Sequence, residues 1–214
     1  MIVYVVIFLI ILVFALPALV ALGFFSVVAL SFGHLGISPT SAILVLLAMF
    51  VGSFLNIPLG RARVVIVEEP GFLGLFRKRA RRLQGISLNV GGGLIPLMLV
   101  GILLPGLPLG STAFATGIVA LSAFLFSKHI PLRGIVLPMG LTALVTVVAA
   151  LLIASNHAPA VAFVAGVTGV LIGADLMRLP DVMRREQGML SIGGAGVFDG
   201  IFLIGIISAL LAGL

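Results

Sequence analysis

Two carboxylates inside otherwise apolar stretches are the residues of this sequence with the clearest chemical capacity. Asp175 stands in GVLIGADLM, and Asp199 stands among glycines in SIGGAGVFDG. Two neighbouring carboxyl groups can share one proton, so that the ionised group activates a water molecule while the protonated group polarises a carbonyl. Ionisable residues within membrane-type segments are rare and usually mark functional sites. Asp175 and Asp199 are therefore the candidate catalytic pair.

Two asparagines and a glycine run accompany these carboxylates. Asn56 and Asn89 lie, like both aspartates, in the half of an apolar stretch that adjoins a basic connector. Either they bind substrate, or they form hydrogen bonds between helices. Glycines are poor helix formers, so the run before Asp199 can unwind and offer backbone groups to a peptide. The expected substrate-binding residues are Asn56, Asn89, Gly193, Gly194 and Gly196.

The composition places these residues in a membrane. Hydrophobic residues make up 62% of the 214-residue chain, charged residues make up 8%, and the mean hydropathy is +1.41. A soluble domain carries about 25% charged residues, so the composition excludes an ordinary soluble enzyme. The absence of cysteine from the sequence excludes disulfides and thiolate metal sites. The three histidines lie in separate connectors without metal-ligand spacing, and neither a metal nor a cofactor is expected.

Seven apolar stretches are long enough to cross a membrane, since about 20 residues span about 30 Å of hydrocarbon. The expected fold is all-α, a seven-span transmembrane helical bundle that forms a single domain, residues 1–214. All twelve Lys and Arg residues fall in alternate connectors. Basic connectors stay in the cytoplasm, so the N-terminus is expected inside and the C-terminus outside a prokaryotic cell membrane that is crossed several times. The expected spans are about 3–30, 40–59, 85–104, 108–127, 134–154, 158–178 and 190–213.

The segment 60–84 is the one sizeable polar part of the sequence. Within it, RVVIVEE alternates weakly and precedes Pro70-Gly71, which predicts a short β-like strand entering a turn. The basic stretch that follows is typical of an interfacial segment on an anionic leaflet, with a solvated loop as the alternative. Because membrane topology explains the net charge of +6, no nucleic acid is expected as a partner. The expected partners are membrane lipids, a transmembrane peptide and further copies in a homo-oligomer.

The connector between spans six and seven, RLPDVMRREQG, makes these spans antiparallel neighbours and puts both aspartates on the cytoplasmic side. Counted at 1.5 Å per residue, Asp199 lies about 6 Å deeper than Asp175. Unwinding of 191–196 or a tilt between the helices would remove this difference. An ion pair with Arg178, three residues on, is the alternative for Asp175. Two stretches also open alike, GISLNVGGGLIPL at 85–97 and LSIGGAGVFDGIFL at 190–203.

Five motifs resemble a prokaryotic membrane-protein family known only as a domain of unknown function. They are NIPL at 56–59, NVGGGLIPL at 89–97, PLRGIVLP at 131–138, GVTGVLIGADLMRLP and SIGGAGVFDGIFL. The resemblance covers most of the chain and implies membership of that family without any established activity.

The aspartates also resemble, more distantly, those of GxGD-type intramembrane aspartyl proteases, the presenilin and signal-peptide-peptidase group. In that group two aspartates lie on consecutive helices joined by a cytoplasmic connection, and the second follows glycines. The resemblance implies that Asp175 matches the first aspartate and Asp199 the second. The sequence departs from the pattern in having Gly-Ala-Asp where the group has Tyr-Asp, and Gly196-Val-Phe-Asp199 where it has its glycine–aspartate motif. No Pro-Ala-Leu span follows Asp199 in this sequence.

Three functions are compatible with these features. The first is an intramembrane aspartyl protease-like protein that hydrolyses membrane-embedded peptides with Asp175 and Asp199. The second is a small proton- or cation-coupled transporter that uses the same acidic residues, because protonatable acids and broken helices also build ion sites. The third is a non-catalytic membrane scaffold in which both aspartates only pack. We expect the first.

Overall fold

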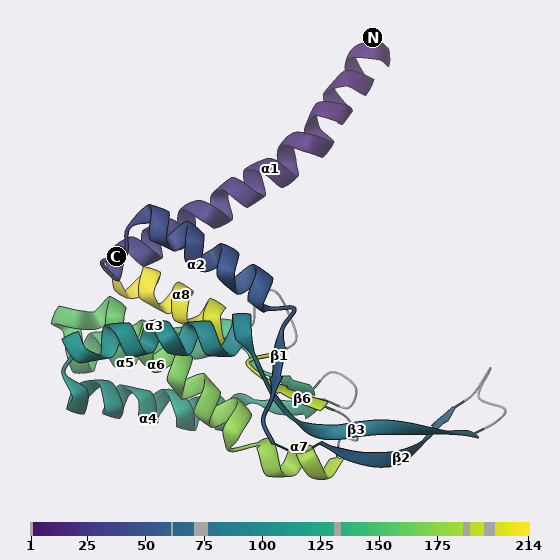
Figure 1. The fold of residues 1–214 in the computed structure, drawn as a ribbon. Coiled ribbons are helices and arrows are strands. Elements are labelled where there is room, and N and C mark those ends of the chain that lie inside the picture. The colour runs from purple at the N-terminus through teal and green to yellow at the C-terminus, as the bar shows by residue number, and fades with distance from the viewer. Residues whose placement is uncertain (1, 61, 71–76, 131–133, 186–188, 195–199) are drawn as a thin grey trace.

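Helices form most of the protein in its computed structural model, which describes residues 2–60, 62–70, 77–130, 134–185, 189–194 and 200–214. The α-helices are α1 Ile2–His34, α2 Pro39–Gly52, α3 Ile95–Leu103, α4 Leu109–Phe126, α5 Met139–Ala154, α6 Ala158–Val170, α7 Leu179–Arg185 and α8 Gly200–Ala212. Shorter 3-10 or π-helical turns adjoin several of them, at η2 Val90–Leu94, η3 Leu104–Gly106, η4 Ser155–His157 and η5 Leu171–Leu176. Figure 1 shows α2 to α6 and α8 gathered in one bundle, with α1 leaving it at an angle.

Three helices are long and apolar enough to cross a membrane, namely Ala15–His34, Leu109–Phe126 and Ser155–Met183. Each of the seven predicted spans overlaps either one of these helices or one of the shorter apolar helices in the described residues, which are Pro39–Gly52, Val90–Gly106, Met139–Ile153 and Gly200–Ala212. The protein is thus mostly helical, and its helices indicate a membrane protein.

A small sheet lies at one end of the bundle, beside α7 (Figure 1). Its strands are β1 Asn56–Pro58, β2 Arg63–Pro70, β3 Arg77–Asn89 and β6 Met189–Ile192, and a separate hairpin joins β4 Lys128–Ile130 to β5 Gly134–Val136. In the sheet, β1 and β2 run antiparallel to β3, whereas β6 runs parallel to it. Ser87 and Leu88 of β3 pair with both β1 and β6, so those two strands lie on opposite edges of β3.

The strands occupy places where the sequence predicts the ends of helical spans. Residues 56–58, 85–89, 134–136 and 190–192 are strands, so the all-α expectation is wrong there. The physical reason is pairing with segments distant in the chain, since Gly85–Leu88 pair in register with Met189–Ile192. The two stretches that open alike are therefore parallel neighbours, each running from a strand through glycines toward a helix.

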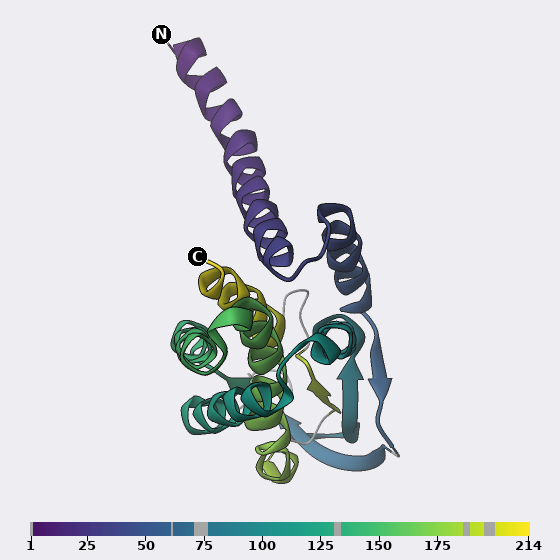
Figure 2. The same cartoon turned by 90° about the vertical axis from the view of Figure 1, so that its left-hand side faces the viewer.

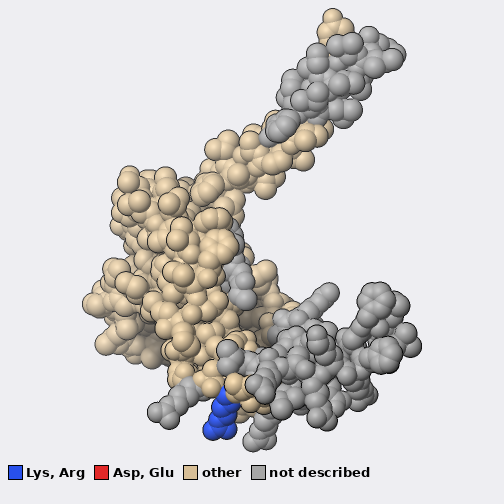
Figure 3. Space-filling model, turned by 45° about the vertical axis from the view of Figure 1, so that its right-hand side comes forward, with Lys and Arg blue, Asp and Glu red and all other residues tan. Residues whose placement is uncertain are grey.

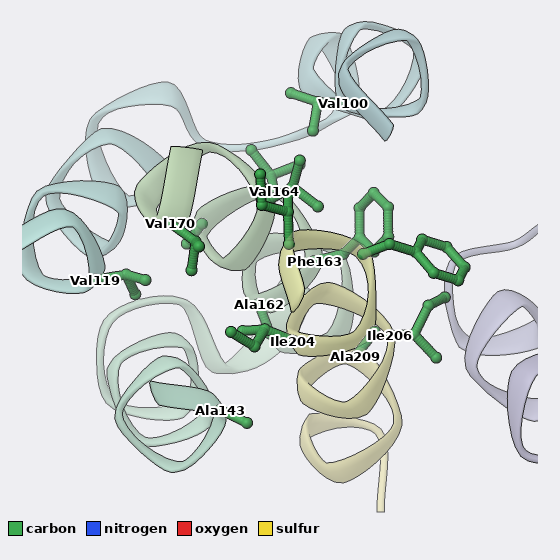
Figure 4. Packing of buried hydrophobic residues seen from close by; sticks show 14 of the residues in the cluster. Val100, Val119, Ala143, Ala162, Phe163, Val164, Val170, Ile204, Ile206 and Ala209 are labelled. Carbon is green, nitrogen blue, oxygen red and sulfur yellow. The ribbon is translucent and has the colours of Figure 1, made fainter. Parts of the chain in front are cut away.

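Helix α6 lies at the centre of the bundle. Ten of its thirteen residues are buried, and it packs against α3, α4, α5 and α8. The Phe163 ring of α6 lies against Gly205 of α8, and Ile204 and Ile206 on either side of that glycine are buried (Figure 4). On the far side of α8, the rings of Phe202 and Phe32 lie 6.4 Å apart, which joins α8 to α1. In lipid such packing is driven by close contact, because lipid chains are as apolar as the side chains they would replace.

The outward faces of the helices are apolar. Leu44, Phe114 and Leu152 are examples of large hydrophobic side chains that are exposed, Leu152 to 81%. Over the described helices, the face drawn in Figure 3 shows no charged side chain, and the basic side chain in view lies at the sheet end. An outer surface with this many exposed large hydrophobic side chains suits contact with lipid rather than with water.

Glycines allow α6 and η5 to approach α4 closely. A Cβ atom added at Gly169 would lie 2.7 Å from the Val119 side chain, and one added at Gly173 would overlap the carbonyl oxygen of Ala120. Gly166 lies in the same way against Gly205 of α8. These three glycines of α6 and η5 are therefore packing positions.

Replacing Gly173 with alanine should destabilise the bundle by about 2 kcal/mol, because the obstructing atom is backbone and cannot rotate away. Gly117 of α4 is the matched control, since an added Cβ there meets nothing within 4 Å. Gly117→Ala should change the stability by less than about 1 kcal/mol. Unfolding in mixed micelles with increasing SDS measures both variants, and equal losses would contradict the packing account.

Candidate functional site

The candidate site lies where the sheet meets the helix ends. β1 follows α2, β3 runs into η2 and α3, and β6 precedes α8 in the chain. The π-helical turn η5, which extends α6 toward the same end, contains Asp175 and contacts β6. Such π turns occur frequently at functional sites. The fold therefore brings together polar side chains from four separate parts of the sequence.

Asn89 is the hub of the polar contacts. Its side chain is fully buried, and its Nδ2 donates to the carbonyl oxygen of Ser53 at 2.8 Å and to Oδ1 of Asn56 at 3.2 Å. Its Oδ1 accepts from the backbone N–H of Gly92 at 2.7 Å, which caps η2. Because the Gly92 N–H requires an oxygen, the orientation of the Asn89 amide is fixed. The side chain thus ties the end of α2, strand β1 and the start of η2 to one another.

Asn56 and Ser191 extend this network to β6. Asn56 lies opposite Asn89 in the β1–β3 ladder and is an exposed residue. The Ser191 Oγ lies 2.7 Å from Oδ1 of Asn56 and 2.8 Å from the carbonyl oxygen of Gly194. A hydroxyl has one proton, so Ser191 donates it to one of these oxygens at a time or shares it between them. Ser191 consequently holds β6 both to β1 and to the turn that follows it.

Asp175 binds that same turn. Its Oδ2 accepts a hydrogen bond of 3.1 Å from the backbone N–H of Gly193, and Asp175 is half-buried. Gly193 and Gly194 both have positive φ angles, +81° and +74°, which L side chains adopt only at a cost. A Cβ atom on Gly193 would lie 2.6 Å from the backbone nitrogen of Gly93. The turn is thus held between the Asp175 carboxylate and the backbone of η2.

Arg178 stabilises the end of α4. Its Nε donates to Ser127 Oγ at 2.8 Å and its Nη2 donates to the carbonyl oxygen of Phe124 at 2.6 Å. The guanidinium also lies 4.7 Å from the centre of the Phe124 ring, which is a cation–π distance. A cation at a helix C-terminus satisfies carbonyls that lack a partner within the helix. These bonds give Arg178 a structural role that is independent of any ion pair with Asp175.

The structure brings together most of the residues that the sequence singled out. Asn56, Asn89, Gly193, Gly194 and Asp175 belong to one connected set of hydrogen bonds and close contacts. The predicted residues Gly196 and Asp199 lie outside the described residues. Within the part of the chain that is described, no group of three or more His, Cys, Asp or Glu side chains is placed to hold a metal.

Sequence reasoning missed Ser53 and Ser191. Ser53 contributes through its carbonyl oxygen, which no side-chain pattern reveals. Ser191 had a detectable signal, because it is a polar residue two positions before the glycine run in an apolar stretch. Its position in β6 opposite Ser87 makes it the link between the asparagines and the Asp175 turn.

Replacing Asn89 with aspartate should destabilise the protein by about 3 kcal/mol, although the two side chains have nearly the same shape. The substitution removes the donors to Ser53 and Asn56 and leaves oxygen atoms facing oxygen atoms in a buried site. Asn89→Ala should cost about 2 kcal/mol through the unpaired Gly92 N–H. Asn156→Asp, at an exposed residue of η4, is the control and should cost less than about 0.5 kcal/mol. If Asn89→Asp is as stable as this control in an SDS titration, the bonds of Asn89 to Ser53 and Asn56 do not stabilise the protein.

Comparison with known proteins gives one match. No curated protein and no solved structure matches the chain, so nothing in these comparisons links it to the aspartyl proteases that its motifs resemble. A family of unknown function is, however, matched over most of the chain, from the end of α2 to α8. The resemblance to an uncharacterised family is confirmed to that extent. Residues 50–211 match the model of the family described as protein of unknown function DUF1614, and the chain belongs to this family.

Proposed function

We propose that the chain is a multi-pass protein of a prokaryotic cytoplasmic membrane, with seven crossings and a cytoplasmic N-terminus. The apolar outer faces of the helices support this proposal, since they suit lipid. The described strands and helix that carry basic residues, β2, β3, β4 and α7, lie together at one end of the bundle (Figure 1). Basic segments gathered at one end are the pattern that the positive-inside rule produces. The sheet and the candidate site would then face the cytoplasm.

Within this membrane protein, Asp175 and Asp199 are proposed to form the catalytic pair of an aspartic-type peptidase for membrane-embedded peptides. One observation carries the proposal, the hydrogen bond from the Gly193 N–H to the Asp175 carboxylate. It fixes Asp175 to the strand and turn that lead directly to Asp199 and α8. Only five residues lie between Gly193 and Asp199 in the sequence, so a short length of chain links the second carboxylate to a residue that is bound to the first.

The proposed reaction is hydrolysis of a peptide bond by a water molecule held between two carboxyl groups. The ionised carboxylate takes a proton from the water as its oxygen attacks the scissile carbonyl carbon, and the protonated carboxyl gives its proton to the carbonyl oxygen. As the tetrahedral adduct collapses and its C–N bond breaks, the carboxyl group that took the water proton gives it to the departing amine nitrogen. One hydroxyl of the adduct returns a proton to the other carboxylate as the new carboxyl group forms. One proton thus cycles within the pair, and no cofactor takes part.

The asparagine network is assigned a positioning role in this reaction. Asn89 has both its amide nitrogen and its oxygen engaged by protein partners, so it acts through Asn56 and Ser191 on the turn at Gly193 and Gly194. Asn56 is the exposed member and remains the proposed substrate contact among the amides. The two glycines of the turn are proposed to leave backbone space for an extended peptide.

Peptide hydrolysis can be detected directly by mass spectrometry. The full-length protein is reconstituted in lipid nanodiscs and incubated with a library of hydrophobic transmembrane peptides in water enriched in heavy oxygen. Hydrolysis is expected to place one heavy oxygen atom in each new C-terminal carboxyl group. A protein that cleaves no peptide but drives proton or cation flux in proteoliposomes would be a transporter, and the peptidase proposal would be wrong.

A further inference from the structure

The ladder formed by β2 and β3 extends beyond the rest of the protein. Arg63–Pro70 pair antiparallel with Arg77–Gln84 over eight residues, a length of about 26 Å at 3.3 Å per residue. Figure 1 shows this ribbon leaving the bundle past β6 and α7. At its base, Gln84 Nε2 donates to the carbonyl oxygen of Met183 at 3.0 Å, which fastens the ribbon to α7. We call this ladder of Arg63–Pro70 and Arg77–Gln84 the arm. The arm has no part in the proposed peptidase reaction.

One edge of the arm has no strand partner in the described part of the chain. β1 and β6 lie on opposite edges of β3, and the bond from the Leu59 N–H to the Ile86 carbonyl oxygen continues the β1 edge toward β2. On the other edge, β6 covers residues 85–88 of β3, and no described strand covers residues 77–83. A strand edge of this kind presents a row of N–H and C=O groups that can pair with another chain.

The charge of the arm selects what can pair with it. Within β2 and β3, six residues are Lys or Arg and two are Glu, so these strands have a net charge of +4. A second copy of the same edge is excluded by repulsion between like charges. An acidic partner, in contrast, would gain attraction along the whole edge.

The direction of the arm disfavours lipid headgroups as the partner. Figures 1 and 2 show that the ribbon continues roughly along the direction in which the bundle helices run. In a membrane the outer part of the arm would then stand well beyond the headgroup layer, which adds only about 5–8 Å to each side of the hydrocarbon. Charges act over about 8–10 Å at physiological salt, so this part of the arm lies out of reach of the lipid surface.

We propose that residues 77–83 of β3 bind an acidic, extended peptide segment of a cytoplasmic partner by strand addition. Backbone hydrogen bonds to the open edge supply the pairing, and the basic residues of the arm supply selectivity for acidic sequences. Nucleic acid offers the charge but not the regularly spaced peptide groups that a strand edge matches.

Binding can be measured with a labelled peptide of alternating Glu and Thr, as long as the edge, added to the full-length protein in nanodiscs of zwitterionic lipid. Fluorescence anisotropy should show saturable binding. The same peptide with alternate backbone nitrogens methylated keeps its charge but loses pairing, and should bind at least about tenfold more weakly. The double variant Arg81→Gln and Arg82→Gln, opposite Ile66 and Val65 in the ladder, should weaken binding about three- to tenfold. Lys128→Gln in β4, outside the arm, should leave binding unchanged.

Three results would overturn this inference. Equal affinity of the methylated peptide would show that charge alone binds and that no strand is added. Tighter binding of a single-stranded oligonucleotide of the same charge would make nucleic acid the better partner. Loss of peptide binding in nanodiscs with anionic lipid would show that lipid occupies the arm. None of these results depends on peptidase activity, so they are distinct from a failure of the proposed reaction.

Discussion

Asp175→Asn should abolish peptide cleavage while leaving the fold intact. Asparagine keeps an oxygen that can accept the Gly193 N–H, so the turn stays bound. It loses the ability to take up or release a proton, and general acid–base catalysis contributes about 10²–10⁴-fold to rates. We expect cleavage to fall by at least about 10³-fold, and Asp199→Asn to have the same effect because the proposed mechanism requires both carboxyls.

The control for this experiment is Asp181→Asn. Asp181 is an exposed acidic residue at the start of α7, on the same side of the protein but outside the polar network. It should retain full activity. Product formation is followed by mass spectrometry and folding by SDS titration, so a variant that is inactive because it is unfolded is recognised. Cleavage that survives in both Asp175→Asn and Asp199→Asn would show that neither carboxylate is catalytic.

Gly193→Ala should be among the most destabilising single-methyl changes in the protein. The backbone at Gly193 has a φ of +81°, which costs a non-glycine residue about 1–3 kcal/mol. The new methyl group would also lie 2.6 Å from the nitrogen and 2.7 Å from the Cα of Gly93, neither of which can rotate away. Such overpacking costs a further 1–3 kcal/mol or so. The expected total is about 3–5 kcal/mol, with loss of the bond to Asp175.

Gly36→Ala separates these two causes. Gly36 has a nearly equal φ of +75°, and an added Cβ meets nothing within 4 Å. It should therefore show the conformational cost alone, about 1 kcal/mol. The difference between the two variants in SDS titration measures the contact between Gly193 and η2. Equal destabilisation would mean that the close approach of the two glycine segments does not contribute to stability.

The positions of the helices could be predicted from the sequence, because long apolar runs suffice to locate segments suited to lipid. The ends of these helices that adjoin the sheet could not be predicted. The strands at 85–89 and 189–192 exist through pairing with each other, and local propensity contains no information about a partner so far along the chain. The similarity of the two glycine stretches could nevertheless be recognised in the sequence. In the structure, the two stretches begin with parallel strands, and a helix follows each strand in the chain.

The residues of the candidate site could likewise be predicted only in part. Asn56, Asn89 and Asp175 were identifiable because polar side chains are conspicuous in apolar stretches. Their partners were not, since Asn89 binds a carbonyl oxygen of Ser53 and a backbone N–H of Gly92. Arg178 is a further case, because its spacing offered a bond with Asp175 as an alternative and gave no sign of its bonds to the end of α4. Spacing along one helix says nothing about a neighbouring helix that offers unpaired carbonyls.

The central claim is that Asp175 and Asp199 meet in one site, and a disulfide cross-link tests it most directly. The chain has no native cysteine, so Asp175→Cys with Asp199→Cys creates a single pair of thiols. A disulfide requires Cβ atoms about 3.5–4.5 Å apart, and two side chains that face each other in one site reach this distance through small backbone movements. Under mild oxidation in nanodiscs, this pair should cross-link at least about tenfold faster than the control pair Asp181→Cys with Asp199→Cys. A 175–199 pair that reacts fully with maleimide yet cross-links no faster than the control would contradict the paired site.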